Sequence, residues 1–169
     1  MSKHLLRRRD PEKARGLLVR FENRILIEKP ISEVFGFLAD FRNVPKWNDF
    51  VHTVKKETEG PVNVGTSYYQ VRRRDEQRFK VTHFDPPRSV TVETDPGSIP
   101  AFTMRFRLEP KAQGTLLHDA WELDTVEHRL LARLLGRRIA REAAANLVKL
   151  KELLETGQTT LRDGRTMTR

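Results

Sequence analysis

The chain has 169 residues, of which 37% are hydrophobic and 33% charged, values typical of a single globular domain. The absence of cysteine excludes disulfides, thiolate nucleophiles and cysteine-bound metals, and no apolar run approaches the roughly 20 residues that cross a bilayer. The net charge of +9 lies largely at the ends, because residues 1–15 carry a net +4 and residues 157–169 a net +2. The basic start lacks the apolar core of a secretory signal, so we expect a cytoplasmic protein.

Residues 18–29 form the first predicted element. Apolar and charged side chains alternate there with a period of two, which predicts a strand with one solvated face. Pro30 ends this strand, and Ser32 is placed to cap a short helix that runs to about Asp40. A second short helical turn is predicted over residues 43–48, with Trp47 turned inward.

The middle of the chain is predicted to be almost entirely strand. Short turns separate six segments with one polar face each, over residues 50–57, 65–74, 77–84, 90–93, 102–109 and 115–123. The clearest alternation places Phe102, Met104 and Phe106 on one face of their strand. Strands of this kind, joined by short turns, predict an antiparallel meander that packs on a single side.

Residues 127–156 contain no proline and repeat apolar side chains every three or four positions, which predicts one long amphipathic helix. Such a helix spans about 45 Å and can cross the whole sheet. Gly157 is expected to end it, and residues 157–169 are expected to form a polar, disordered tail. The predicted fold class is therefore α+β.

Three short segments carry a family resemblance. They are the strand-to-helix entry IEKPISEVF at 27–35, the short-helix segment NVPKWN at 43–48 and VGT at 64–66. With the order of the elements, they resemble the START-like or SRPBCC superfamily, in particular its bacterial polyketide cyclase/dehydrase members. The resemblance covers about residues 18–156. It implies a helix-grip fold, in which a curved seven-stranded antiparallel sheet wraps around the long C-terminal helix.

The same resemblance implies a hydrophobic cavity between the sheet and the helix. We accordingly divide the chain into a basic N-terminal arm (1–17), a START-like ligand-binding domain (18–156) and a polar C-terminal tail (157–169). The superfamily has no universal catalytic signature, so the resemblance names no catalytic residue. The residues that we expect to line the cavity are Asn23, Trp47, Tyr69, Phe79, His83, Phe102, Met104, Phe106, Asp119, Trp121, Ile139, Ala143, Asn146 and Leu147.

Polar residues on the predicted apolar face are the most informative members of that set. Asn23 and Asp119 fall on strands that are adjacent if the last strand returns beside the first, where a hydrogen bond would offset the cost of a buried carboxyl. Ligand contact or general-base chemistry by Asp119 is the alternative interpretation. His83 lies roughly 14 Å from Asp119 by strand spacing, which is too far for a catalytic dyad. His118 neighbours Asp119 in sequence but faces the other side of the sheet.

Other chemistry has little support in the sequence. The five histidines show no metal-ligand spacing, there is no glycine-rich phosphate loop, and we expect neither a metal nor a cofactor. The alanines at 140 and 143–145 leave room for a cavity, although alanine is also the best helix former. Arginines at 72–74 and along the first half of the long helix form either a solvated surface or an entrance that favours an anionic ligand or an anionic membrane.

Three functions follow from these observations. The first is a non-covalent carrier or sensor of a small hydrophobic molecule, such as a lipid, polyketide or quinone-like compound. The second is a metal-free cyclase/dehydrase of the aromatase type, with Asp119 or His83 as proton-transfer groups; the scarcity of convergent acid–base residues ranks it below the carrier. The third is a basic adaptor that binds nucleic acid or an anionic membrane through its tails. A homodimer and peripheral membrane contact fit the sequence, whereas a nucleic-acid partner is not expected.

Overall fold

The computed structural model describes residues 17–125 and 129–169; the expectations for the basic arm fall almost wholly outside these ranges. The elements are β1 (Leu17–Ile27), α1 (Ile31–Ala39), the 3₁₀ helix η2 (Phe41–Lys46), β2 (Val51–Lys56), β3 (Ser67–Arg72), β4 (Glu76–Asp85), β5 (Ser89–Thr94), β6 (Ala101–Lys111), β7 (Gly114–Thr125), α2 (Arg129–Thr156), β8 (Gln158–Thr160) and β9 (Thr166–Thr168). In the described ranges, no helix is long and apolar enough to span a membrane.

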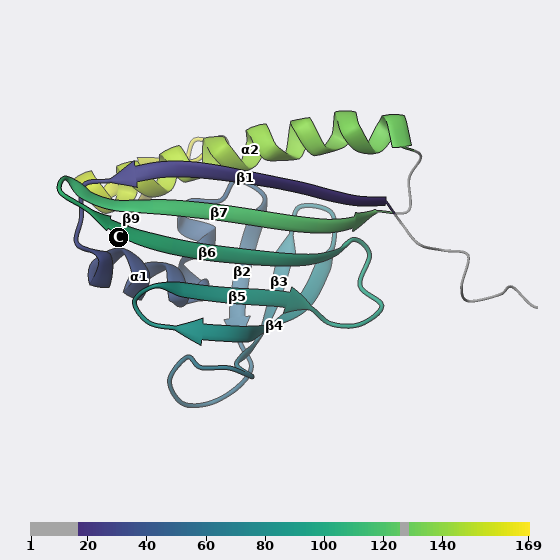
Figure 1. Ribbon diagram of the computed structural model, residues 1–169, viewed down its shortest axis with the longest axis horizontal. Coiled ribbons are helices and arrows are strands. Elements are labelled where there is room, and N and C mark those ends of the chain that lie inside the picture. Colours follow the sequence, from purple (N-terminus) through teal and green to yellow (C-terminus); the bar gives the residue numbers. More distant parts are fainter. Residues whose placement is uncertain (1–16, 126–128) are drawn as a thin grey trace, which may run out of the picture.

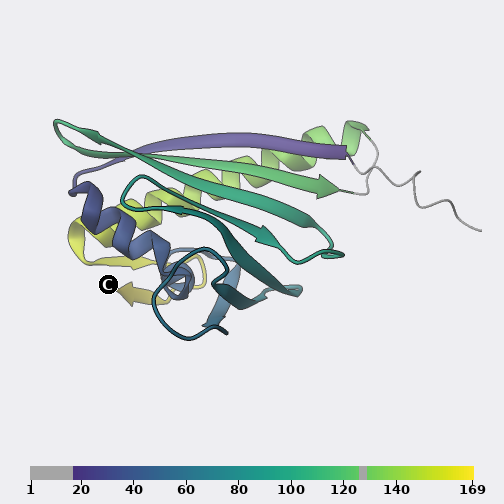
Figure 2. The ribbon, with the colours of Figure 1, turned by 60° about the horizontal axis from the view of Figure 1, so that its bottom comes forward.

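Seven strands form one antiparallel sheet in the order β1-β7-β6-β5-β4-β3-β2 (Figure 1). The predicted meander and the return of the last strand beside the first are both confirmed. β1 pairs with β7 along its whole length, from Leu17 opposite Thr125 to Ile27 opposite Thr115. The fold is α+β, with the long helix and the two short helices on one side of the curved sheet (Figure 2).

A glycine makes the tight β6–β7 turn possible. Gly114 has a φ of +136°, and a Cβ there would lie 2.8 Å from the Cα of Glu28. No other residue fits both the backbone conformation and the close approach of the chain after β1. The turn therefore fixes the register in which β7 returns alongside β1.

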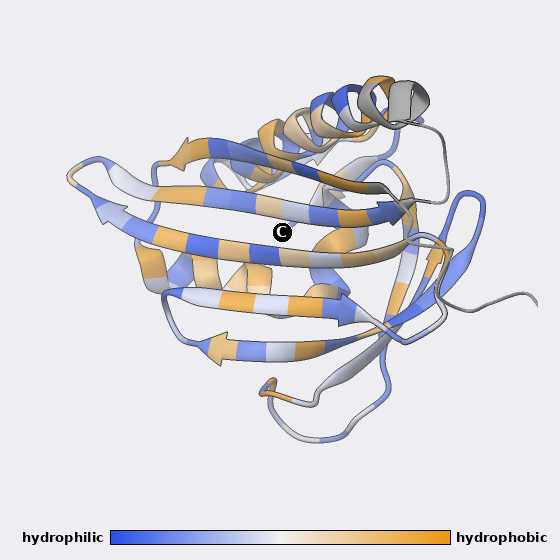
Figure 3. Cartoon of the chain, turned by 45° about the vertical axis from the view of Figure 1, so that its right-hand side comes forward, coloured by the Kyte–Doolittle hydropathy of each residue, from blue (hydrophilic) through white to orange (hydrophobic). Residues whose placement is uncertain are grey.

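Alternating hydropathy along the strands places the core on the side of the sheet that faces the helices (Figure 3). The C-terminal half of α2 fills its part of this side, because Leu150, Leu153 and Leu154 are at most 1% exposed and belong to the hydrophobic core cluster. Nearer the start of α2, Leu135 and Ile139 are only half-buried, and Leu134 is exposed. The C-terminal half of α2 thus covers one end of the sheet, and space remains between the sheet and the N-terminal half of the helix.

The expected disordered tail is wrong, because residues after the helix fold back as the β8–β9 hairpin. Gly157, with a φ of +88°, reverses the chain. Thr159 and Leu161 are then buried at 2% and 3% exposure, and the hydroxyl of Thr159 donates to Glu152 of α2 at 2.5 Å. The segment is too polar to predict as structured, but its two buried side chains and its hydrogen bonds to the domain hold it in place.

Candidate functional site

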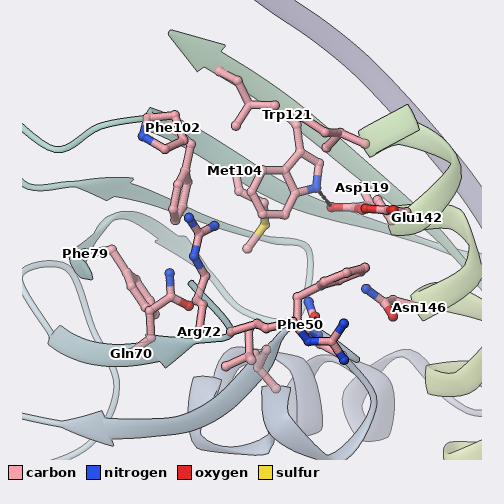
Figure 4. Close-up of a pocket in the computed structure, with 18 of the residues that line it drawn as sticks. Phe50, Gln70, Arg72, Phe79, Phe102, Met104, Asp119, Trp121, Glu142 and Asn146 are labelled. Carbon is pink, nitrogen blue, oxygen red and sulfur yellow. Dashed lines mark hydrogen bonds between the residues drawn. The ribbon is translucent and has the colours of Figure 1, made fainter. Parts of the chain in front are cut away.

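A cavity of about 560 Å³ lies between the sheet, the first half of α2 and the η2–β2 connection (Figure 4). Its apolar wall comes from alternate residues of β4, β6 and β7, so the pleat of the sheet presents a row of large side chains to the same space. Ten of the fourteen residues expected from the sequence line it: Trp47, Phe79, Phe102, Met104, Phe106, Asp119, Trp121, Ile139, Ala143 and Asn146.

The short helix η2 brings Trp47 to this wall. The carboxylate of Asp40 accepts a hydrogen bond from the backbone N–H of Arg42 at 3.1 Å, which caps the start of η2. The chain then turns so that Trp47 is 6% exposed and its ring centroid lies 6.5 Å from that of Phe106 on β6. Both tryptophans of the chain, Trp47 and Trp121, therefore border the cavity.

The prediction that His83 faces the cavity is wrong. The β4–β5 register shifts between Val81 and His83, so the alternation that places Phe79 and Val81 inward is interrupted there. His83 is exposed, and its Nε2 lies 3.0 Å from the hydroxyl of Ser89. It therefore lies outside the cavity wall.

Tyr69 is also on the wrong face of its strand. Tyr68 lies opposite Phe79 in the β3–β4 register and is completely buried, so the residue beside it points outward. The hydroxyl of Tyr69 donates to Glu76, and the guanidinium of Arg78 lies 4.9 Å from its ring centroid. Aromatic or apolar residues occur at both parities of this strand, so alternation alone could not select the inward one.

Asn23 and Leu147 are near the cavity but do not line it. Asn23 lies opposite Asp119 in the register, as predicted, yet its amide donates to the carbonyl of Ala140 at 3.1 Å and ties β1 to α2. Leu147 is 2% exposed within the packed core. Both have structural contacts in place of the expected contact with the cavity.

Asp119 is the buried carboxyl of the site. It is 3% exposed, and its Oδ1 accepts a hydrogen bond from Nε1 of Trp121 at 2.7 Å. Burial raises the pKa of Asp119 from 3.8 to about 7, against the smaller opposing effect of that hydrogen bond. His118 lies on the other face, 3.0 Å from a carboxylate oxygen of Glu22, so it cannot assist Asp119.

Two amides complete the polar lining. Gln70 on β3 is 6% exposed and borders the cavity, and within the described ranges its side chain has no hydrogen-bond partner. Asn146 on α2 is 4% exposed, and its Oδ1 accepts the backbone N–H of Asp49 at 3.2 Å. Among the described residues, the amide nitrogen of Asn146 has no acceptor.

Five arginines also line the cavity, at positions 72, 73, 74, 138 and 162. Arg72 forms a two-point ion pair with Asp75, through Nε at 2.6 Å and Nη2 at 2.7 Å. Arg138 pairs with Glu142 at 3.2 Å. The sequence indicates the arginines at 72–74 and 138 as an entrance, whereas it gives no signal for Arg162, which follows the long helix in a polar segment.

A buried aspartate positions Arg162. Asp49 accepts hydrogen bonds from Nζ of Lys149 and from the backbone N–H of Arg162, both at 2.8 Å. The guanidinium of Arg162 lies over the ring of Phe50, 5.6 Å from its centroid. One carboxylate thus joins the η2–β2 connection, α2 and the C-terminal hairpin. In the part of the chain that the structure describes, no three His, Cys, Asp or Glu side chains gather as a metal site would require.

Solved structures of other proteins share this architecture. The aromatase/cyclase StfQ, a di-domain protein of the steffimycin biosynthetic pathway, aligns with a TM-score of 0.68 at 15% identity, over 86% of this chain and 53% of that one. This chain therefore spans about half of that protein. A Staphylococcus aureus protein of unknown function aligns with a TM-score of 0.69 at 12% identity, over 83% and 96% of the two chains. The Aha1 dimer of Colwellia psychrerythraea gives 0.59 at 20% identity, over 82% and 98%.

At these identities the likeness shows the fold alone. No curated protein matches the sequence. The family model described as polyketide cyclase / dehydrase and lipid transport matches residues 19–155, which include the seven-stranded sheet except the first two residues of β1, and all but the last residue of α2. The chain belongs to this polyketide cyclase/dehydrase family of the SRPBCC type.

Proposed function

We propose that the protein binds a small hydrophobic molecule non-covalently in this cavity and acts as its carrier or sensor. The observation that carries the proposal is a space of about 560 Å³ that remains beside a continuous cluster of buried hydrophobic residues. This volume is within the roughly 300–1,000 Å³ typical of small-molecule sites. The family description, which includes lipid transport, supports the same function.

The wall of the cavity explains how such a ligand would be held. Phe102, Met104 and Trp121 present apolar surface that a bound hydrocarbon or ring would cover, and each methylene taken out of water contributes about 0.8 kcal/mol. Methionine adapts its shape to different ligands, and aromatic rings contribute area with little loss of entropy. Affinity would thus come from burial, and selectivity from the few polar groups.

A second candidate is an enzyme of the cyclase/aromatase type, and one observation favours it. A carboxyl with a pKa of about 7 inside an apolar cavity suits general acid–base catalysis at neutral pH, and Asp119 is such a group. His83 has no part in this proposal, because it lies outside the cavity. Turnover of a polyketide-like substrate that falls steeply in Asp119→Asn would favour the enzyme over the carrier.

Native mass spectrometry of the purified protein tests the carrier proposal. We expect a co-purified small molecule on the wild type and its loss from Ala143→Phe, which places a ring in the cavity. Val148→Phe is the matched control, since it adds the same ring at an exposed position of the same helix. Equal occupancy of the two variants, or binding that persists in Ala143→Phe, would refute binding in the cavity.

A further inference from the structure

The cavity has two polar ends with an apolar body between them. Figure 4 shows Gln70 and Arg72 on one side and Asp119, Glu142 and Asn146 on the other. Between them lie Phe50, Met104 and Trp121, with the guanidinium of Arg162 over the ring of Phe50. A ligand that fills this space would therefore meet different polar groups at its two ends, and the chemistry of each end selects a different functional group.

The β3 end is suited to an anion. Asp75 occupies Nε and Nη2 of Arg72, which leaves the two N–H groups of Nη1 for a ligand. The buried amide of Gln70 lies beside this guanidinium on the same strand and has a free N–H₂ group in the described part of the chain. Arg73 and Arg74 also line the cavity, and among the described residues neither has a carboxylate within 4.0 Å. The local charge thus remains positive after the ion pair of Arg72 is counted.

The opposite end is suited to a neutral hydrogen-bonding group. Asp119 uses one oxygen for Trp121, and within the described ranges its other oxygen has no partner. Asn146 uses its oxygen for the backbone of Asp49 and keeps its N–H₂ group available. Glu142 lines the same end and is paired with Arg138, so a carboxylate placed there would meet mainly the buried carboxyl of Asp119. A hydroxyl or keto group can bond to these side chains without that repulsion.

We propose that the ligand is a hydrophobic carboxylic acid that carries a hydroxyl or keto group at a distance from its carboxylate. The carboxylate binds Arg72 and Gln70, and the distal oxygen binds Asp119 and Asn146. This assignment rests on the proposed ligand-binding function and adds the substrate class and the orientation in the cavity. Charge-assisted hydrogen bonds to arginine supply the larger part of the selectivity, because they are about twice as strong as neutral ones.

Isothermal titration calorimetry with three probes of equal chain length tests the assignment: 12-hydroxydodecanoate, dodecanoate and 1,12-dodecanediol. The full chain should bind the hydroxy acid most tightly. Arg72→Gln should weaken both acids by about tenfold to a hundredfold and the diol by less than about twofold. Asp119→Ala should reduce the affinity for the hydroxy acid to that for dodecanoate.

Two control variants distinguish the two-ended assignment from the proposed function, which is the binding of hydrophobic molecules in the cavity. Arg78→Gln removes a paired arginine from the outer face of β4 and should leave all three affinities unchanged. Ala143→Phe should abolish binding of every probe. If the three probes bind equally and only Ala143→Phe weakens them, the cavity binds hydrophobic molecules but the two-ended assignment is wrong. If no probe binds, or binding survives Ala143→Phe, the proposed function itself fails.

Discussion

Asp119 gives the protein a stability that depends on pH in an unusual direction. Burial raises the pKa of its carboxyl from 3.8 in a solvated chain to about 7 in the folded protein. Between these values the folded state holds a proton that the unfolded state has lost. Stability from this group is therefore fully present below about pH 4 and is lost as the pH rises through about 7.

The magnitude follows from the two pKa values. Each pH unit of difference corresponds to about 1.4 kcal/mol, so the full effect is on the order of 4 kcal/mol. Water that enters the cavity reduces it, and we expect about 2–4 kcal/mol. Asp119→Asn lacks the titration and keeps an oxygen that can accept the Trp121 hydrogen bond. As the pH rises from 4.5 to 8, the unfolding free energy of Asp119→Asn should increase by this amount relative to that of the wild type.

Urea unfolding of both proteins across this pH range measures the effect. Trp121→Phe is the informative companion, because it removes the hydrogen bond that lowers the pKa of Asp119 and should extend the loss of stability to higher pH. Curves of unfolding free energy against pH that stay parallel for the wild type and Asp119→Asn would show that the carboxyl is solvated, and the description of the site would be wrong.

Three further substitutions, two of them with a control substitution, test the fold around the site by urea unfolding at pH 7. Lys149→Met leaves the buried Asp49 carboxylate without its ammonium partner and should cost roughly 3 kcal/mol, whereas Arg20→Met in an exposed pair should cost less than about 1. Gly114→Ala should cost roughly 2 kcal/mol or more from backbone strain, while Gly36→Ala, with open space around it in α1, should stabilise by about 0.5–1. Leu161→Ala should cost about 2–4 kcal/mol, and no change would indicate that the hairpin does not form.

The sheet could be predicted because its strands have one solvated face and one buried face. Phe102, Met104 and Phe106 alternate with polar residues, and the structure places all three in the cavity wall. Alternation does not identify the inward side chain where apolar residues occur at both parities or where a register shift interrupts the strand. Tyr68 and Tyr69 offer equal hydrophobicity at opposite parities, and the register shift before His83 moves that side chain outward without any local sequence signal.

Long-range polar contacts could not be predicted at all. Asp49 binds Lys149 and the backbone of Arg162, which are about a hundred residues away in the chain. The C-terminal hairpin depends on that contact and on two buried side chains among mostly polar residues. Neither composition nor periodicity records such pairings, so Arg162 was missed as a lining residue while the tryptophans and phenylalanines of the wall were found.

Binding in the cavity can be tested most directly by NMR, through the two tryptophan indole N–H signals. Both side chains border the cavity, and the N–H of Trp121 is bonded to Asp119. In a titration with 12-hydroxydodecanoate, both indole signals should shift and saturate together, while amides of the β6–β7 turn, which is not part of the cavity lining, stay in place. Indole signals that do not move while surface amides shift would contradict a ligand-binding cavity.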